Sequence, residues 1–145
     1  VTTDLPDNLS NIHPPGKWVV GSRLAAIALA KTYGKHMPFS GPCFKRVTKA
    51  GDKLLLYFDH ADGGLRSRDG KPLDYFEIAA KDGRYYPANA IIKGDHIELS
   101  SKEVGKPVDA RFAWIESAQP NFVNKAGLPA VPFRTDTPYR DMELN

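Results

Sequence analysis

The sequence has little cysteine, little excess charge and no long hydrophobic run. The single cysteine, Cys43, excludes an internal disulfide and leaves the redox compartment open. The net charge of +3 is small and the basic residues are scattered, so the composition does not predict a nucleic-acid partner. No apolar run approaches the ~20 residues of a membrane-spanning helix. These absences leave an ordinary folded domain as the expectation.

The sequence also lacks the common catalytic and cofactor motifs. It contains no G-x-S-x-G, no glycine-rich phosphate loop, no H-E-x-x-H and no C-x-x-C. Its four histidines show no metal-ligand spacing, so we predict neither a metal nor a cofactor. Structural roles are the better interpretation for three of these histidines: His36, His60 and His96.

One helix is indicated near the N-terminus. Residues 17–33, K-W-V-V-G-S-R-L-A-A-I-A-L-A-K-T-Y, follow Pro14 and Pro15 and precede Gly34, which favours a left-handed C-terminal cap. The helix is apolar around most of its circumference. Such a pattern predicts that it is buried on a sheet or between layers.

From residue 44 onward the hydrophobic period changes to two. Six strand candidates alternate with turn dipeptides, and they are F-K-R-V-T-K, D-K-L-L-L-Y-F-D, D-Y-F-E-I-A-A, A-N-A-I-I-K-G, D-H-I-E-L-S-S and P-V-D-A-R-F-A-W-I-E-S. In the last of them one face is expected to carry Val108, Ala110, Phe112 and Trp114. This spacing predicts an antiparallel β-sandwich of roughly ninety residues.

The two ends of the chain lead to further expectations. The start, V-T-T-D-L-P-D, is typical of a strand end that runs into a loop, and it lacks an initiator Met and a signal peptide. We therefore expect a processed subunit or a piece of a longer polypeptide. After Gln119 the chain is rich in proline and aromatics, and we expect this tail to pack back on the helical segment, with Arg134 pairing with a carboxylate there.

The stretch N-I-H-P-P-G-K-W places a histidine on a stiff elbow. The two prolines restrict the backbone and pre-set φ for the first helical turn, so His13 is oriented by the helix that follows it. A loop histidine, a core histidine and a catalytic base all fit this pattern. From the residues alone these alternatives stay open.

Several motifs, taken in order, resemble one family. N-I-H-P-P-G-K-W-V-V-G-S-R-L-A, then S-G-P, then the F-A-W strand, then N-K-A-G-L-P-A-V-P-F-R-T-D are similar to the C-terminal part of the sialate O-acetylesterase family of SGNH/GDSL-type hydrolases. The resemblance implies a mixed fold. Residues 1–38 would be the last loop and helix of an SGNH-type α/β hydrolase domain, and residues 39–145 an accessory antiparallel β-sandwich.

The same resemblance implies a site. His13 matches the catalytic histidine of the family, which takes a proton from a serine hydroxyl and returns it to the leaving sugar oxygen. The family's acidic position before the histidine holds Asn11 here, so the orienting carboxylate is open between Asp7, which we favour, Asp4, and neither. The serine belongs to earlier family blocks, and Ser10, Ser22 and Ser40 do not lie in such a block.

These implications define the expected function. The chain would be the C-terminal subunit or fragment of a carbohydrate O-acetylesterase, active only with an N-terminal polypeptide or upstream segment that carries the serine. We expect an extracytoplasmic protein, either secreted, periplasmic or lysosomal. The acetylated sugar stays open, because related acetylesterases of plant polysaccharides share this architecture.

The alternative function is a non-catalytic carbohydrate-binding or structural β-sandwich module, in which His13 is only a loop residue. Exposed aromatics on a sandwich stack on sugars, and the candidates are Tyr75, Tyr85 and Tyr86. The stronger interpretation of these tyrosines is a hairpin whose aromatics fill cross-strand pairs.

Overall fold

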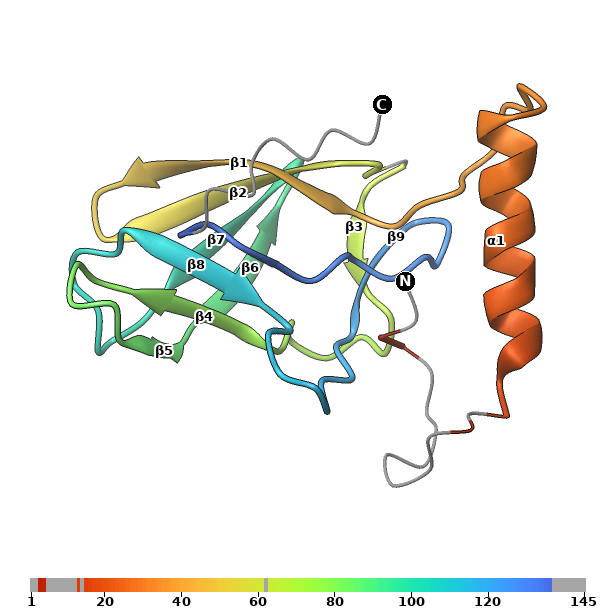
Figure 1. Cartoon of the computed structure of the whole chain (residues 1–145). Helices are drawn as coiled ribbons and strands as arrows, with labels where there is room; N and C mark the ends of the chain where they lie inside the picture. The colour runs from red at the N-terminus through yellow and green to blue at the C-terminus, as the bar shows by residue number, and fades with distance from the viewer. Residues whose placement is uncertain (1–2, 5–12, 14, 62, 137–145) are drawn as a thin grey trace.

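A computed structural model describes residues 3–4, 13, 15–61 and 63–136 of the chain. It shows a β-sandwich with one helix standing to its side (Figure 1). After the helix, the chain enters the sandwich through strand β1. This architecture confirms the antiparallel β-sandwich predicted for the region after residue 38.

Within the described residues, two four-stranded antiparallel sheets face each other. The first has the order β1-β2-β7-β6, which are Cys43–Ala50, Lys53–Asp59, His96–Ser100 and Asn89–Lys93. The second has the order β10-β8-β4-β5, which are Phe133–Arg134, Asp109–Phe112, Phe76–Ala79 and Tyr85–Pro87. A short pair, β3 (Leu65–Ser67) and β9 (Phe122–Asn124), lies on the side facing the helix. All six predicted strand segments form strands.

The core lies between the two sheets and follows the alternation of the sequence. On β7, Ile97 and Leu99 are fully buried, while the residues between them face outward. The second sheet contributes Ile78, Ala110 and Phe112 from the opposite side. Period-two burial removes one face of each sheet from water, which is the main favourable contribution to folding.

A group of phenylalanines fills one end of this core. Phe112 contacts three other rings at centroid distances between 4.6 and 5.9 Å, and these rings belong to Phe76, Phe122 and Phe133. Phe122 lies on β9 and Phe133 on β10, so the last two strands both contribute rings to the core. Aromatic pairs at such separations add about 0.5–1.5 kcal/mol each beyond area burial.

The predicted face of β8 ends one residue earlier than the sequence suggests. Val108, Ala110 and Phe112 are shielded, but Trp114 is 45% exposed. The reason is a backbone turn at Ala113, which has φ of 50° and donates its N–H to the Tyr75 carbonyl at 3.0 Å. A residue in the left-handed region reverses the alternation, so Trp114 leaves the core.

The C-terminal tail is part of the sandwich. We expected residues 120–136 to pack back on the helical segment, and instead they form β9 beside β3 and β10 beside β8. Arg134 likewise pairs with its neighbour Asp136, at 2.6 Å through two hydrogen bonds, and not with a carboxylate of the helical segment. Residues 137–145 lie outside the described part of the chain.

Two of the motifs that carry the family resemblance meet at the entry to β1, where they form a clasp. The Asn124 side-chain amide donates to the carbonyls of Ser40 and His60 at 3.0 and 2.9 Å, and its oxygen accepts from the Leu128 N–H at 3.1 Å. The Val131 N–H donates to the Pro42 carbonyl at 2.9 Å. S-G-P and N-x-x-G-L-P-A are therefore two sides of one packed junction.

The predicted helix forms as α1, Lys17–Lys31, and Gly34 follows it with φ of 65°. Its predicted burial is wrong for this chain: none of the residues of α1, all of which the structure describes, is buried. Trp18 is 81% and Leu24 62% exposed, because the helix stands beside the sandwich and not on the face of either sheet. Within the described residues no helix is long and apolar enough to cross a membrane.

Candidate functional site

His13 lies directly before α1, as the sequence predicts, and its side chain is exposed. The helix is nucleated by the residues that follow the prolines: the Lys17 N–H donates to the Pro15 carbonyl at 2.9 Å, and the Val19 N–H donates to the Gly16 carbonyl at 3.0 Å. The backbone after His13 is thus fixed within one turn of a regular element. An imidazole here is accessible to a substrate that approaches from outside.

Of the two carboxylates considered as partners of His13, only one can be described. Asp7 lies outside the described residues, so its predicted role stays a prediction. Asp4 forms a bidentate ion pair with Arg23 of α1, with both nitrogen–oxygen distances at 2.7 Å. The side chains of Asp4 and Arg23 are only 10% and 15% exposed, so the pair is largely withdrawn from water.

A second arginine joins this pair from the sandwich. Arg68, which follows β3, donates to the backbone carbonyl of Asp4 at 2.8 Å and lies 4.0 Å from its carboxylate. Burial raises the pKa of Asp4, but the hydrogen bonds and charge of Arg23, with the charge of Arg68, outweigh it and hold that pKa below its usual range. Asp4 is therefore a carboxylate at neutral pH.

Two of the serines considered in the sequence, Ser22 and Ser40, make local hydrogen bonds. The Ser22 hydroxyl donates to the Val19 carbonyl within the helix at 2.9 Å. The Ser40 hydroxyl lies 3.0 Å from the Gly41 carbonyl and 3.4 Å from the Cys43 sulfur. In these contacts both serine hydroxyls bind groups close to them in the sequence, and neither binds a histidine. Ser10 lies outside the described residues.

Two of the other histidines, His60 and His96, have structural surroundings, whereas His36 is exposed. The ring of His60 packs edge-on against Phe39 at 4.9 Å, and its carbonyl accepts from Asn124. His96 lies 5.2 Å from the Tyr57 ring and hydrogen-bonds Asp95. Across the described part of the chain no three histidines, cysteines or carboxylates gather in a way that would hold a metal ion.

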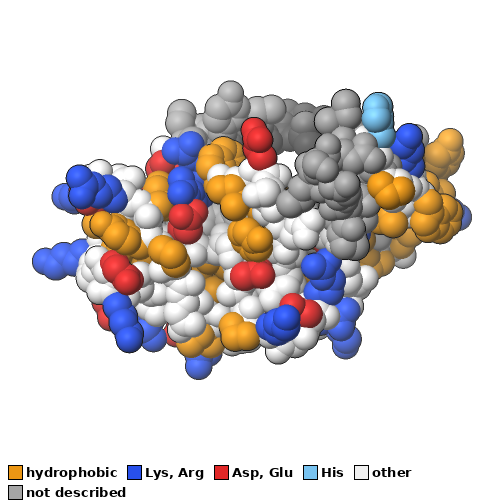
Figure 2. All heavy atoms as spheres, turned by 90° about the horizontal axis from the view of Figure 1, so that it is seen from below, with side chains coloured by type: hydrophobic (Ala, Val, Ile, Leu, Met, Phe, Trp, Pro, Cys, Tyr) orange, Lys and Arg blue, Asp and Glu red, His pale blue; other side chains and the backbone are white. Residues whose placement is uncertain are grey.

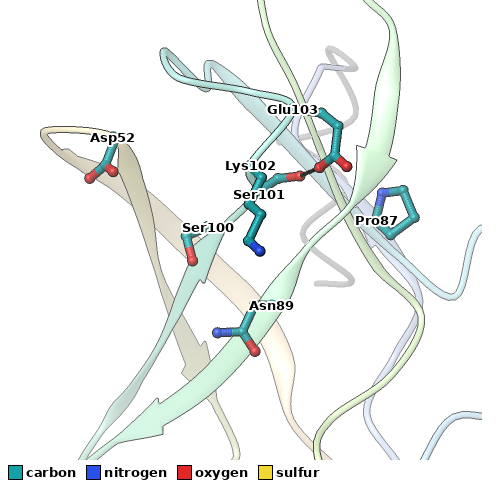
Figure 3. A pocket seen from close by; sticks show the side chains of 7 residues that line it. All are labelled: Asp52, Pro87, Asn89, Ser100, Ser101, Lys102 and Glu103. Carbon is teal, nitrogen blue, oxygen red and sulfur yellow. Dashed lines mark hydrogen bonds between the residues drawn. The ribbon is translucent and has the colours of Figure 1, made fainter.

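An open groove of about 520 Å³ lies far from His13. Figure 3 shows it beside the turn between β1 and β2, at the end of the sandwich opposite α1. Its lining is polar and comes from Asp52, Pro87, Asn89, Ser100, Ser101, Lys102 and Glu103. Ser101 and Glu103 hydrogen-bond each other at 2.6 Å, and the lining lacks an aromatic side chain for sugar stacking. This groove is a poor candidate for the site.

The outer face of the second sheet carries paired charges. Arg111 makes two hydrogen bonds to Glu77, at 2.6 and 3.0 Å, and its guanidinium lies 4.2 Å from the Tyr85 ring. Burial, together with the nearby Asp136 charge, raises the pKa of Tyr85 to about 12. Tyr85 and Tyr86 lie on the predicted hairpin strand β5, where both are partly buried, so cross-strand packing describes them better than sugar stacking.

Little in the sequence predicts the Asp4–Arg23–Arg68 cluster. Arg23 belongs to the narrow polar edge of the helix, and Asp4 was considered only as a partner of His13. The available signal was that the helix has few charges, so each charge on it is a candidate for a buried pair. Arg68 could not have been included, because its position depends on how the sandwich sits beside the helix.

The comparisons with known proteins add one informative relative. No protein-family model and no curated protein matches the chain. Among solved structures, it is similar to the crystal structure of XAC1771, a novel carbohydrate acetylesterase from Xanthomonas citri, with 41% sequence identity and a TM-score of 0.88 over 92% of this chain. The chain spans 31% of the length of that acetylesterase. A carbohydrate acetylesterase relationship is therefore supported over nearly the whole chain.

Proposed function

We propose that this chain is the part of a carbohydrate O-acetylesterase that carries the catalytic histidine, His13. The observation that carries the proposal is the similarity to XAC1771, which extends over 92% of the chain at 41% identity. Two observations support His13 as the base: its motif resembles that of SGNH-type sialate O-acetylesterases, and its side chain is exposed directly before a regular helix. The proposed substrate is an O-acetylated sugar.

The proposed chemistry divides acyl transfer into two steps. His13 removes the proton of a serine hydroxyl while the serine oxygen attacks the acetyl carbonyl, and the sugar oxygen leaves with the proton from the imidazolium. Water then attacks the acetyl-serine, again with His13 as the base, and acetate is released. Asp7 is proposed to hold the tautomer of the ring through Nδ1. The serine would come from a region outside this chain.

The proposed source of that serine is an upstream segment of one longer polypeptide. In XAC1771 the matching region makes up 31% of a single chain, so the comparison favours this form over a separate subunit. Residues 1–38 would then complete an SGNH-type α/β domain, and residues 39–145 would form the accessory sandwich. An extracytoplasmic location is part of the same proposal.

The uncovered face of α1 supports a missing catalytic part. Trp18, Leu24 and Leu29 leave apolar surface exposed, and in Figure 2 hydrophobic side chains gather at the end of the molecule where α1 stands. Patches of this kind mark interaction sites on soluble proteins. Leu24→Lys should hardly change the stability of this chain, whereas in the complete enzyme it should reduce the free energy of unfolding by at least about 2 kcal/mol. If Leu24→Lys leaves the free energy of unfolding of the complete enzyme unchanged, this face of the helix is not covered there.

The direct test of the proposal is His13→Ala in the complete enzyme. Turnover of an activated acetyl ester should fall by about three orders of magnitude or more with folding intact, because a triad member is removed. The matched control is His36→Ala, which removes another exposed imidazole from the other end of the same helix. If His13→Ala keeps more than about a tenth of the wild-type activity, His13 is not the catalytic base.

One observation favours the second candidate, a carbohydrate-binding module. Trp114 is 45% exposed and Tyr75 37% exposed at one end of the second sheet, where the Tyr75 carbonyl binds the residue before Trp114. Exposed rings of this kind stack on sugar faces. Titration calorimetry of the chain with acetylated oligosaccharides, for wild type and Trp114→Ala, separates the two functions: binding lost in the variant supports a module, and no binding favours the esterase part alone.

A further inference from the structure

Three charged residues from three separate segments meet beside the start of α1. Asp4 belongs to the N-terminal segment, Arg23 to the helix and Arg68 to the sandwich just after β3. Arg23 holds both carboxylate oxygens of Asp4 at 2.7 Å, and Arg68 holds its backbone carbonyl at 2.8 Å. The helix therefore binds the side chain of Asp4 through Arg23, and the sandwich binds its main chain through Arg68.

These contacts are well ordered because the ion pair is largely buried and because Arg68 is itself held by the sandwich. The Asp4 and Arg23 side chains are 10% and 15% exposed, and a bidentate guanidinium–carboxylate pair fixes orientation as well as distance. Arg68 is anchored in turn, because its N–H donates to the Asn121 carbonyl at 2.8 Å. Asn121 is itself buried and hydrogen-bonded to Asp74 and Asp69.

His13 lies between the two points that this cluster connects. Following the chain, Asp4 comes first, then His13, then Lys17 at the start of the helix, and Arg23 lies on the second turn of that same helix. The ion pair therefore fastens the chain before His13 to the element that follows His13. It adds a restraint before His13 to the one that Pro15 and the first helical turn supply after it.

We propose that Asp4, Arg23 and Arg68 form a positioning clamp for His13, in which the sandwich takes part through Arg68. The inference rests on the proposed function, since it assigns positioning residues to that site. None of the three touches the reacting atoms. Arg68 gives the accessory sandwich a part in catalysis: it holds Asp4, which the ion pair joins to the helix that follows His13.

The clamp differs from a direct role of Asp4 as the acid that orients the imidazole. In the clamp the Asp4 carboxylate acts through Arg23, so Asp4→Asn, Arg23→Lys and Arg68→Ala should impair the enzyme in the same way. Asp4 as the orienting acid would make Asp4→Asn far more harmful than either arginine variant, and it would lower the apparent pKa of the base in that variant alone. Lysine keeps the charge of Arg23 but loses the second hydrogen bond.

The first measurement is the kinetics of the complete enzyme with an activated acetyl ester. Arg68→Ala and Arg23→Lys should lower kcat about 10- to 100-fold, as loss of supporting residues does, while KM stays within about twofold. Arg68→Lys, which keeps a charged donor, should recover part of the loss. Lys45→Ala, which removes an exposed ion pair with Asp59 on the sandwich, is the matched control and should stay near wild type. Unchanged kcat in both clamp variants would overturn the proposal.

The second measurement does not depend on activity. In NMR spectra of the complete enzyme, the imidazole resonances of His13, identified by their loss in His13→Ala, should broaden or split in Arg68→Ala and Arg23→Lys and stay sharp in Lys45→Ala. A purely stabilising role would lower the unfolding temperature and leave these resonances unchanged, which would overturn the clamp. If His13→Ala retains activity while the resonances respond as expected, the clamp stands and the proposed catalytic role fails.

Discussion

Gly41 is the position where one methyl group should do most damage to the sandwich. A Cβ built on Gly41 would lie 1.9 Å from the Pro129 carbonyl oxygen, 2.4 Å from the Pro129 carbonyl carbon and 2.6 Å from the Leu128 carbonyl oxygen. All three atoms belong to the backbone, so no side chain can move aside. Relief requires a shift of about 1 Å or more between the two segments of the clasp, because real Cβ atoms essentially never approach within 3.0 Å.

The magnitude follows from what that shift breaks. The two segments are joined by the bonds from Asn124 to the Ser40 carbonyl and from Val131 to the Pro42 carbonyl, and Asn124 and Pro42 are fully buried. Overpacking costs about 1–3 kcal/mol, and each buried polar group left unpaired adds about 1–3 kcal/mol. We expect Gly41→Ala to lower the free energy of unfolding by about 3–5 kcal/mol.

The assay is urea unfolding of the chain, followed by circular dichroism and tryptophan fluorescence. Gly105→Ala is the matched control, because nothing lies within 4 Å of a Cβ at Gly105 and no positive φ constrains either glycine. Reduced conformational entropy of the unfolded chain should leave that variant neutral or stabilised by up to about 1 kcal/mol. If the two variants differ by less than about 1 kcal/mol, the steric reasoning is refuted.

Two further predictions concern the charged face of the second sheet. Because the pKa of Tyr85 is raised to about 12 in the folded chain, its contribution to stability is complete below the unfolded value of about 10 and is lost as the pH rises through 12. Absorbance at 295 nm should show one late-titrating tyrosine, which Tyr85→Phe removes; a titration that is complete near pH 10 would contradict the shift. Glu77→Gln should cost about 1–3 kcal/mol, since it weakens two bonds to Arg111, whereas Asp59→Asn in the exposed pair with Lys45 should cost less than about 1 kcal/mol. If urea unfolding shows that Glu77→Gln and Asp59→Asn lose the same free energy of unfolding, the partial burial of the Glu77–Arg111 pair does not strengthen it.

Local patterns in the sequence were enough to predict the sandwich. Alternation placed Ile97 and Leu99 in the core, and the turn glycines stand at left-handed positions such as Gly51 and Gly94, where strands reverse. Helix α1 was predicted by its period and by Gly34 at its end. Each of these features depends on residues within one or two turns of each other, so the sequence alone reveals them.

Features that depend on distant segments were not predicted. The inward position expected for Trp114 failed because Ala113 takes a left-handed conformation that no glycine announces. Burial of α1 was expected from its composition, yet composition does not say whether the covering surface lies in the same chain. The Asp4–Arg23 pair and its contact with Arg68 arise only when three segments come together in space. His13 was predicted from a family resemblance, and its catalytic role stays a prediction.

The clasp around Asn124 has a consequence for the synthesis of the protein. The entry to β1, at Ser40–Pro42, is completed by residues 124–131, which leave the ribosome more than eighty residues later. Contacts of such sequence separation form slowly and only after the intervening chain is available. The part of the core that Phe122 and Phe133 complete must therefore wait, with its apolar side chains exposed, until the last strands emerge. A nascent chain stalled before Asn124 should be a substrate for chaperones, and release of residues 120–134 should be the step that commits the domain to its fold.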